Sequence, residues 1–396
     1  MTEKDWQDLY LRIAFSAGLK HLEKPFLYHV DRDELYEIDE KALRFLARCN
    51  GTRSVRELTQ EFEFVDYCLQ EGLLELMDQP VPIPVPLPRS PVPSLRYLEL
   101  QLTHRCNLKC RHCYLGPPRE SVLALKDALV IIEEFAAHGG LRLLLSGGEP
   151  LLYPDLKELI AGTEGMKLHR VILTNGTRIN PENIHDLKVE NIQFSLDGWR
   201  QGHEVLRGPG TFQQALHGIE AARNAGISVS IATMIHQGNL EEFDRLQSFV
   251  EEINATEWGI DVLGLAGSLA LNKDLLVTGE RAAPLMAYAF GGGYHGPSDG
   301  FGCGRHLVTV MPSGEMAKCG FYADRPLGNA VQRGLIHCWL RLPHVPLTDL
   351  ECQGCPALEE CAGGCRFRAP HPLGPDPVMC ALYRYSGVAV KDGELT

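Results

Sequence analysis

The sequence predicts an α/β protein built around a parallel sheet that curls into a partial (β/α)6 barrel of the TIM type. Strand-like apolar runs and helix-like amphipathic runs alternate between residues 96 and 263, so that each strand is followed by a crossover. Glycine and polar residues recur where these strands end, which is where such folds place their functional groups. The expected strands occupy 96–103, 141–148, 169–176, 191–198, 227–235 and 255–263.

The helices expected between these strands show apolar residues at helical spacing. After the first strand, Leu125, Ile132 and Phe135 mark one face of a helix. The helix expected at 211–226 closes with a glycine, a residue that commonly terminates helices. Two further helices are expected, at 154–162 and 239–253.

A proline-rich segment separates a small N-terminal unit from the barrel. Residues 79–94 alternate proline with small and apolar residues, which prevents a helix and a complete strand ladder. We therefore place an N-terminal domain at 1–80 and an extended linker at 81–94. Within this domain we expect strands at 25–30 and 34–39 and helices at 40–51, 54–62 and 64–76.

Composition and charge exclude several classes of function. The chain has 396 residues, enough for two or three domains, and 44% of them are hydrophobic. A net charge of -13 argues against a general binder of nucleic acid or anionic membranes, because a phosphate backbone needs a basic surface. The start of the chain lacks the features of a secretory signal, and no apolar run is long enough to cross a bilayer. We therefore expect a cytoplasmic protein in which 13 cysteines indicate metal or cluster ligation rather than disulfides.

Three of these cysteines, Cys106, Cys110 and Cys113, lie close together directly after the first barrel strand. Clustered thiolates are typical of zinc sites and of iron–sulfur clusters. A structural zinc site needs a fourth ligand, for which His104 and His112 are candidates. Three thiolates without a fourth protein ligand would instead leave one coordination position for another molecule.

Short motifs at three successive strand ends favour the second interpretation. LSGGEP (145–150), TNGT (174–177) and SLDG (195–198) each close a predicted strand. Each motif taken singly is typical of a turn or a helix cap. Because the carboxyl ends of neighbouring parallel strands meet at one edge of the sheet, the three are predicted to form a polar cradle facing the cysteine loop.

With these motifs, residues 95–263 resemble the radical S-adenosylmethionine (SAM) superfamily. The cluster motif of that family, Cys-x3-Cys-x-aromatic-Cys, is matched by Cys106, Cys110 and Cys113, with His112 in the aromatic position. The resemblance implies that these thiolates are catalytic and hold a [4Fe–4S] cluster whose fourth iron is chelated by SAM. It also implies SAM contacts from Gly147, Gly148, Glu149, Pro150, Asn175, Ser195, Asp197 and Arg207.

The resemblance implies a separate role for several of these contacts. Gly147 and Gly148 let the backbone approach the methionine ammonium, and Glu149 offers it a carboxylate. Arg207 is expected to pair with the SAM carboxylate as a charge-assisted donor. A surface salt bridge is the alternative interpretation of Arg207.

The C-terminal cysteines resemble the SPASM extension of radical SAM enzymes, which carries two auxiliary iron–sulfur clusters. The radical SAM core with its connecting segment is then expected at 95–300, and the SPASM domain at 301–396. A zinc ribbon would use only four of these cysteines. The resemblance assigns Cys303, Cys319 and Cys365 to one cluster and Cys352, Cys355, Cys361 and Cys380 to the other, both expected to be [4Fe–4S].

The chain departs from the SPASM pattern at one point. Members with a fully ligated first auxiliary cluster have an additional cysteine shortly before the position of Cys303, and this sequence has none there. His295 and Asp299 are candidates for the fourth ligand. The remaining cysteines, Cys49, Cys68 and Cys338, are expected to be buried structural thiols.

Residues 25–78 resemble the precursor-peptide recognition element of enzymes that modify ribosomally made peptides. A generic winged-helix domain would give a similar pattern. The resemblance implies that a leader peptide adds a strand to an exposed sheet edge beside the third helix. The proline-rich linker would then let this domain present the core peptide to the barrel.

Together these resemblances imply a radical SAM peptide maturase. An electron donor such as flavodoxin or ferredoxin would reduce the cluster, and the 5′-deoxyadenosyl radical from SAM would take a hydrogen from a peptide carbon. A thioether, a carbon–carbon bond, epimerisation and oxidation all remain open as outcomes. A radical SAM enzyme acting on a small molecule or tetrapyrrole is an alternative. A non-catalytic iron–sulfur scaffold or electron carrier is another, although a carrier has no use for the GGEP motif.

Overall fold

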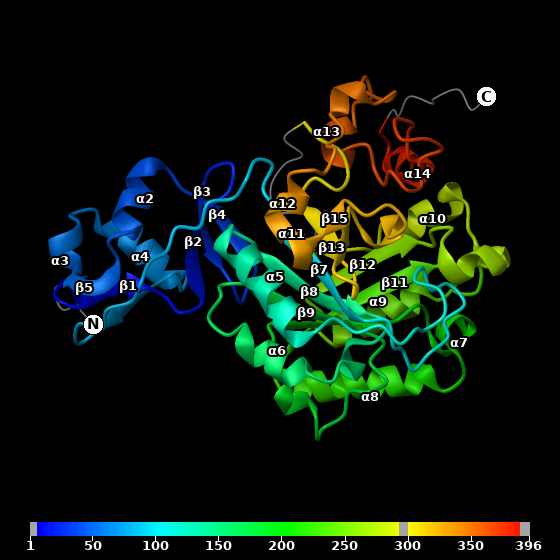
Figure 1. Ribbon diagram of the computed structural model, residues 1–396, viewed down its shortest axis with the longest axis horizontal. Coiled ribbons are helices and arrows are strands. Elements are labelled where there is room, and N and C mark those ends of the chain that lie inside the picture. Colours follow the sequence, from blue (N-terminus) through cyan, green and yellow to red (C-terminus); the bar gives the residue numbers. More distant parts are fainter. Residues whose placement is uncertain (1–5, 293–299, 389–396) are drawn as a thin grey trace.

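The centre of the computed structural model, which describes residues 6–292 and 300–388, is a sheet of parallel strands that follow one another in sequence order (Figure 1). Every neighbouring pair from β7 to β12 is in parallel register. The six predicted strands are therefore confirmed. They are β7 (Tyr97–Thr103), β8 (Arg142–Gly147), β9 (His169–Thr174), β10 (Asn191–Ser195), β11 (Ser228–Ile235) and β12 (Glu257–Val262).

Three further strands extend this sheet beyond β7, and the sequence did not predict them. β13 (Leu307–Val310) pairs in parallel with β7, and β14 (Glu315–Ala317) and β15 (Gly328–Asn329) follow in antiparallel register. The result is a nine-stranded mixed sheet. The C-terminal cysteine segment is thereby attached next to the strand that leads into the first cysteine loop.

Helices cover the outer face of the sheet and bury their apolar residues against it. Ile131 and Phe135 of α5 and Phe212 of α8 are almost fully buried in the main core, together with Trp258 of β12. Between β7 and β13 the described residues contain two α-helices that were not predicted from the sequence, α7 (Arg200–Arg207) and α10 (Gly279–Met286). The predicted ones are α5 (Leu125–Ala137), α6 (Leu156–Gly162), α8 (Thr211–Asn224) and α9 (Phe243–Glu252).

From residue 6 onward, where the structure describes it, the N-terminal lobe contains two three-stranded antiparallel sheets and the three helices α2 to α4 (Figure 1). Its core includes Cys49 and Cys68, which are buried as predicted. The expected helix at 64–76 is wrong at its end, because Gly72 closes it at positive φ and Leu74 then pairs with Ile13 as a strand. The elements are β1 (Tyr10–Ile13), β2 (Ala17–His21), β3 (Pro25–His29), β4 (Glu34–Glu37), α2 (Glu40–Leu46), β5 (Asn50–Ser54), α3 (Val55–Leu58), α4 (Phe62–Gln70) and β6 (Leu74–Met77).

This lobe contacts the barrel at the amino ends of its strands. The Lys20 ammonium donates to the carbonyl of Gly140, 2.7 Å away, just before β8. It also donates to the carbonyl of Lys167, 2.9 Å away, just before β9. Arg142, the first residue of β8, pairs with Asp33 of the lobe. The lobe and the cysteine loop therefore lie at opposite ends of the barrel strands.

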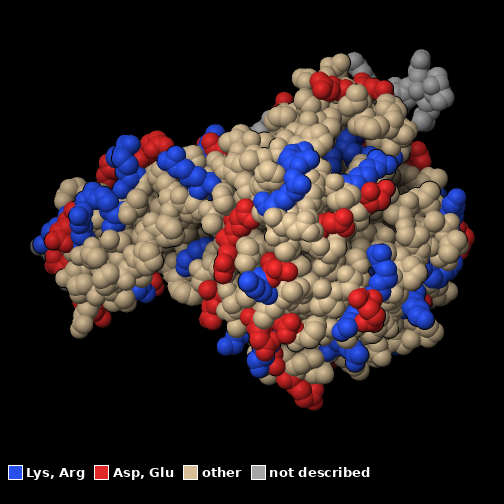
Figure 2. Space-filling view, in the orientation of Figure 1, with Lys and Arg blue, Asp and Glu red and all other residues tan. Residues whose placement is uncertain are grey.

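The C-terminal segment is built from short helices and loops above the sheet (Figure 1). Across residues 6–292 and 300–388 no helix is both long and apolar enough to span a membrane. On the face drawn in Figure 2, basic and acidic residues are interspersed over the part of the chain that the structure describes. The helices of the segment are α11 (Ala330–Arg333), α12 (Leu335–Trp339), α13 (Leu358–Cys361) and α14 (Pro377–Tyr385).

Candidate active site at the carboxyl end of the barrel

The first cysteine loop leaves β7 and brings three thiols together. Cys106, Cys110 and Cys113 are all half-buried. Burial raises the pKa of Cys106, and the neighbouring Cys113 raises it further. Burial likewise raises the pKa of Cys110 to about 11, with contributions from both other thiols. The three thiols thus influence one another's pKa values, and binding a cation nearby would favour their deprotonated forms.

Gly147 and Gly148 lie directly against the backbone that leads into this loop. The Gly148 amide donates to the carbonyl of Thr103 over 2.7 Å, and the Glu149 amide donates to Arg105 over 2.9 Å. A Cβ atom added to Gly147 would lie 2.2 Å from the Thr103 oxygen, and one on Gly148 would lie 2.3 Å from the Arg105 oxygen. Only glycine permits this approach, which fixes the GGEP motif beside the cysteine loop. Pro150 begins the short helix that follows and is buried.

Glu149 connects the end of β8 with the end of β9. Its side chain is fully buried and accepts hydrogen bonds from the Thr174 hydroxyl at 2.8 Å, the Asn175 amide at 3.0 Å and the Leu151 amide at 3.1 Å. Burial raises the pKa of Glu149, whereas these donors act against that shift. The Asn175 side chain in turn donates to Asn107 of the cysteine loop over 3.1 Å. Glu149 and Asn175 therefore fix the position of the cysteine loop relative to the ends of β8 and β9.

Asp197 and Arg207 form a buried ion pair beside the thiols. Asp197 is fully buried, the Arg207 side chain is only 11% exposed, and the Arg207 Nε donates to Asp197. Burial would raise the pKa of Asp197, but the Arg207 charge outweighs it and holds that pKa well below its usual range. Arg207 is close enough to Cys106 and Cys110 to lower their pKa values. The surface salt bridge considered for Arg207 is therefore wrong, because the pair is buried in the site.

Three histidines lie near this ion pair, the half-buried His112 and the fully buried His203 and His236, and only His112 was noted from the sequence. Burial lowers the pKa of His112 and of His203 to about 4, and that of His236 falls for the same reason. One ring nitrogen of each has no hydrogen-bond partner within the described part of the chain. Ser195, at the end of β10, is half-buried. These polar atoms leave hydrogen-bonding capacity in the cradle for a polar ligand.

The donor set of the cradle fits SAM. The methionyl part of SAM has an ammonium, which needs an anionic partner, and a carboxylate, which needs a cationic one. The Arg207 guanidinium is a cationic partner for the carboxylate, and its Nε is held in place by Asp197. Gly147 and Gly148 expose backbone rather than side chain at the adjacent strand end. Among the described residues no three His, Cys, Asp or Glu side chains converge on a position for one metal ion.

Most of the C-terminal cysteines lie near one another in two groups. In the first group, the Cys365 thiol donates a hydrogen bond to the Cys303 sulfur. This bond outweighs the effect of burial and lowers the pKa of Cys303 to about 6. Cys319 lies near both sulfurs. A separate small cavity is lined by the second group of thiols, Cys352, Cys355, Cys361 and Cys380.

The remaining C-terminal positions are accounted for differently. Cys338 belongs to neither group and is fully buried in the main core, as predicted. The candidate ligands His295 and Asp299 lie outside the described residues.

Inside the barrel, a polar network that the sequence analysis missed joins the first cysteine loop to β13. The Glu99 carboxylate accepts from Ser146 at 2.7 Å, from Tyr114 at 3.2 Å and from Thr309 at 2.6 Å. Burial, followed by the neighbouring Glu99 charge, raises the pKa of Tyr114 well above its usual value. The signal was available, because Glu99 and Gln101 alternate with leucines in β7 and so share its inner face.

The fold, the thiol loop and the cradle define the class to which this chain belongs. The family model described as "Radical SAM superfamily" matches residues 100–250, which contain all three thiols and the cradle. Residues 100–250 therefore form a radical SAM domain, as the sequence analysis expected.

The relatives of this chain fall into two kinds. It is 32% identical over 206 residues to an AdoMet-dependent heme synthase of Oleidesulfovibrio alaskensis, covering 50% of this chain and 53% of that protein. It is 28% identical over 340 residues to the mycofactocin maturase MftC of Mycolicibacterium smegmatis, covering 76% and 86%. The chain thus spans about half the length of the heme synthases it matches, but most of the maturase.

Among solved structures, the fold is similar to that of Streptococcus suis SuiB bound to the precursor peptide SuiA. The TM-score is 0.67 at 17% identity, with 92% of this chain and 98% of that chain covered. This coverage includes parts of the chain outside the radical SAM domain. The partial barrel with its additional N- and C-terminal parts is therefore a fold that known proteins share.

Proposed function

We propose that this protein is a radical SAM enzyme that modifies a ribosomally synthesised precursor peptide. The single observation that carries the proposal is the arrangement at the barrel mouth, where three thiols lie beside the buried Asp197–Arg207 pair and the glycine-lined strand end. When bound, the cluster and SAM supply a 5′-deoxyadenosyl radical that takes a hydrogen atom from a substrate carbon. A flavodoxin or ferredoxin is the proposed electron donor.

In this proposal the residues of the cradle bind and orient SAM. Cys106, Cys110 and Cys113 hold the cluster, and Arg207, oriented by Asp197, pairs with the SAM carboxylate. Backbone of Gly147 and Gly148 contacts the methionine ammonium beside the Glu149 carboxylate. Pro150, Asn175 and Ser195 complete the ribose and methionyl side of the site.

The C-terminal thiols are proposed to hold two auxiliary clusters. Cys303, Cys319 and Cys365 form one ligand set, and Cys352, Cys355, Cys361 and Cys380 form the other. The three-thiol set lies near Glu99, which also contacts the loop that follows Cys113. This placement favours transfer of an electron between the barrel site and the auxiliary set, or the binding of a substrate thiolate at the latter.

The N-terminal lobe supports a peptide as the substrate. In the described residues β4 is an edge strand, pairing only with β3, and Tyr36 of β4 lies 3.3 Å from Glu71 at the end of α4. The sheet β2-β3-β4 therefore has two edges, β2 and β4, and a free sheet edge is what adds a peptide strand in β-augmentation. The maturase relative and the SuiB fold, each matched over most of its length, support the same choice.

Modification of a tetrapyrrole is the second candidate function. It is favoured by the heme synthase relatives, although they are matched over only about half of their length. It gives no role to the free sheet edges of the N-terminal lobe.

The deciding experiment uses the anaerobically reconstituted full-length protein with SAM, dithionite and the short peptides encoded beside its gene. We expect 5′-deoxyadenosine and a mass change in one peptide, which fragmentation would assign to a thioether, a carbon–carbon bond, or an oxidised or epimerised residue. The matched arm replaces the peptides with iron coproporphyrin. Turnover of the porphyrin and of none of the peptides would establish the second candidate instead.

A further inference from the structure

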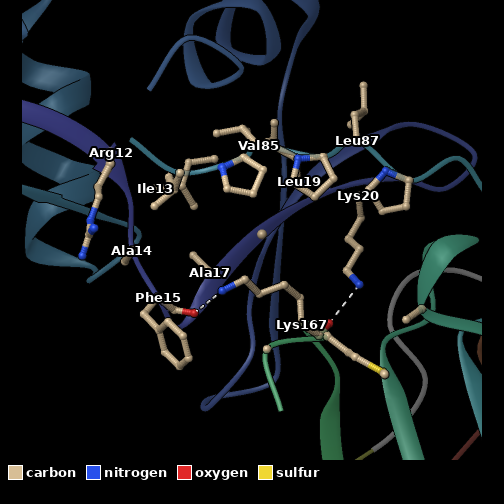
Figure 3. Close-up of a pocket in the computed structure, with 18 of the residues that line it drawn as sticks. Arg12, Ile13, Ala14, Phe15, Ala17, Leu19, Lys20, Val85, Leu87 and Lys167 are labelled. Atoms are coloured by element: carbon tan, nitrogen blue, oxygen red, sulfur yellow. Dashed lines mark hydrogen bonds between the residues drawn. The ribbon is translucent and has the colours of Figure 1, made fainter. Parts of the chain in front are cut away.

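A second cavity lies far from the cradle, between the N-terminal lobe, the proline-rich linker and the barrel (Figure 3). Its volume is about 650 Å³, and its lining is mostly apolar. β2 forms one wall, the linker residues 83–88 form the opposite wall, and the end of α5 with Lys167 closes the barrel side. This chamber is large enough for several residues of a peptide.

The wall formed by β2 has unpaired backbone groups directed at the chamber. The Val30 amide donates to Ser16, so the pairs that exchange hydrogen bonds with β3 involve Gly18 and Lys20. Leu19 lies between these two residues and therefore directs its N–H and C=O away from β3. On that side the structure gives Leu19 no backbone partner in its described part. β2 thus presents an open strand edge inside an apolar cavity.

The linker cannot close this edge, because of its sequence. It runs parallel to β2 and pairs with His21, which donates to the Pro88 carbonyl and accepts from the Ser90 amide, each within 2.9 Å. If this pairing continued two residues towards the N-terminus, the Leu19 carbonyl would accept a hydrogen bond from the backbone N–H of residue 88. Residue 88 is a proline and has no N–H, so the pairing stops. The linker therefore diverges from β2, and the wedge between them is the chamber.

The rim of the chamber carries an exposed aromatic ring and a cation. Phe15 is 72% exposed, and the Lys167 ammonium lies 4.5 Å from its ring centroid and donates to its carbonyl (Figure 3). Lys167 forms no ion pair with any residue that the structure describes. A large exposed ring on an apolar cavity is typical of an interaction site, and the unpaired ammonium favours an acidic group on the partner.

We propose that this chamber binds an extended segment of the precursor's leader peptide, which pairs with Leu19 as an additional strand on the free edge of β2. The segment places apolar side chains in the chamber and a carboxylate beside Lys167. This inference rests on the proposed function. It concerns β2, the sheet edge opposite β4, whereas the sequence analysis expected the leader on the edge beside the third helix. An open backbone edge selects a peptide over a lipid or other apolar molecule, because only a peptide satisfies both the N–H and the C=O of Leu19.

The position of the chamber sets a minimum length for the precursor. The chamber lies at the amino ends of the barrel strands, whereas the cradle lies at their carboxyl ends. β8 has 6 residues, which corresponds to about 20 Å at the usual rise of a strand. The bound leader segment and the modified residue must therefore be separated by at least about six extended residues.

Hydrogen exchange of the full-length protein tests the site with the neighbouring-gene peptide that the enzyme modifies. Binding is expected to slow exchange in the segment 17–21, where the Leu19 amide is free, and to leave 34–37 unchanged. A modified peptide that protects 34–37 instead would overturn this site and leave the proposed function standing. A set of peptides that is neither modified nor protective would overturn both.

Matched tryptophan substitutions provide an independent readout. Ala137, exposed at the end of α5, lines the chamber, so Ala137→Trp is expected to weaken peptide binding by at least about tenfold. Ala161→Trp, on an exposed alanine near the end of α6 and outside the chamber, is the control and is expected to bind normally. Both variants should cleave SAM without peptide at the parent rate. Equal peptide affinity in the two variants would overturn the proposal.

Discussion

The two cysteine-bearing regions of this protein are organised by different forces. Around the barrel thiols, Glu149 and the Asp197–Arg207 pair are buried and hydrogen-bonded, and the strand ends beneath them belong to the main apolar core. Between residues 350 and 370 the chain has one helix of 4 residues, and its buried hydrophobic side chains are Leu350 and Ala357. The first region is built by packing, whereas the second has little packing of its own.

This difference indicates how each region depends on metal. Where a site rests on an apolar core, its geometry exists before the metal binds, and ligand loss removes chemistry rather than structure. Where a segment buries little, metal binding supplies much of its folding free energy. The same ligand, a cysteine thiolate, is therefore expected to have a functional role in the barrel and a structural one in the C-terminal segment.

The largest effect is expected from replacing the three barrel thiols. The Cys106→Ala, Cys110→Ala, Cys113→Ala triple variant should lose about four of about twelve iron atoms and produce no 5′-deoxyadenosine above background. Its thermal unfolding should change little, because these side chains are half-buried at the surface of an intact core. Iron analysis, product chromatography and calorimetry are the measurements. SAM cleavage by this variant would contradict the assignment of the site.

Removing iron should unfold the C-terminal segment and spare the barrel. After anaerobic treatment with an iron chelator, limited proteolysis is expected to cut within 350–380 first, because its short helices depend on the cysteine ligands. The barrel helices, whose apolar faces are in the main core, should resist under the same conditions. Mass spectrometry of the fragments locates the cuts. Simultaneous loss of both regions would show that the comparison is wrong.

Within the barrel, Asp197→Asn should have the next largest effect. It leaves the Arg207 charge buried without its partner, which costs about 3–5 kcal/mol of unfolding free energy. Because the folded pKa of Asp197 is depressed, its contribution is fully present above about pH 4 and is lost as the pH falls towards that depressed value. Urea unfolding at a series of pH values should therefore show a shallower acid loss in the variant.

The control for this prediction is Asp186→Asn. Asp186 pairs with Lys157, and both side chains are more than half exposed. Solvent screens such a pair, so stability should change little. A similar loss in both variants would mean that burial of the Asp197–Arg207 pair is not the cause.

The sequence predicted the parts of this molecule in which apolar pattern and local structure agree. β8 and β9 are apolar runs without an exposed residue, as expected for strands covered on both faces, and the cradle motifs mark where the strands end. The two groups of C-terminal thiols could be predicted only through a resemblance, because their ligand sets interleave in the sequence.

The parts that sequence reasoning missed bury polar residues. The buried residues of α7 are Gly202, His203 and Leu206, so its inner face lacks a repeating apolar pattern. The sequence of this segment is therefore typical of an exposed segment rather than of a packed helix. β2 contains Lys20, which is almost fully buried against the barrel yet is typical of a surface position. Both misses fall where the chain builds the cradle or joins its domains. The buried Lys20 ammonium is satisfied only by carbonyls far away in the sequence, those of Gly140 and Lys167.

The smallest effect that still separates the two regions is expected from Glu149→Gln. The glutamine keeps the shape of the buried side chain but replaces one acceptor oxygen with a donor facing the Thr174 hydroxyl or the Asn175 amide. One buried hydrogen bond is lost, which costs about 1–3 kcal/mol of unfolding free energy. Glu158→Gln, on the exposed face of α6, should be neutral. Since Glu149 joins the ends of β8 and β9, the variant should also bind SAM more weakly while the iron content of the C-terminal segment stays unchanged. Equal stability of the two glutamine variants would mean that the cradle, like the C-terminal segment, depends on its bound cofactors rather than on its own hydrogen bonds.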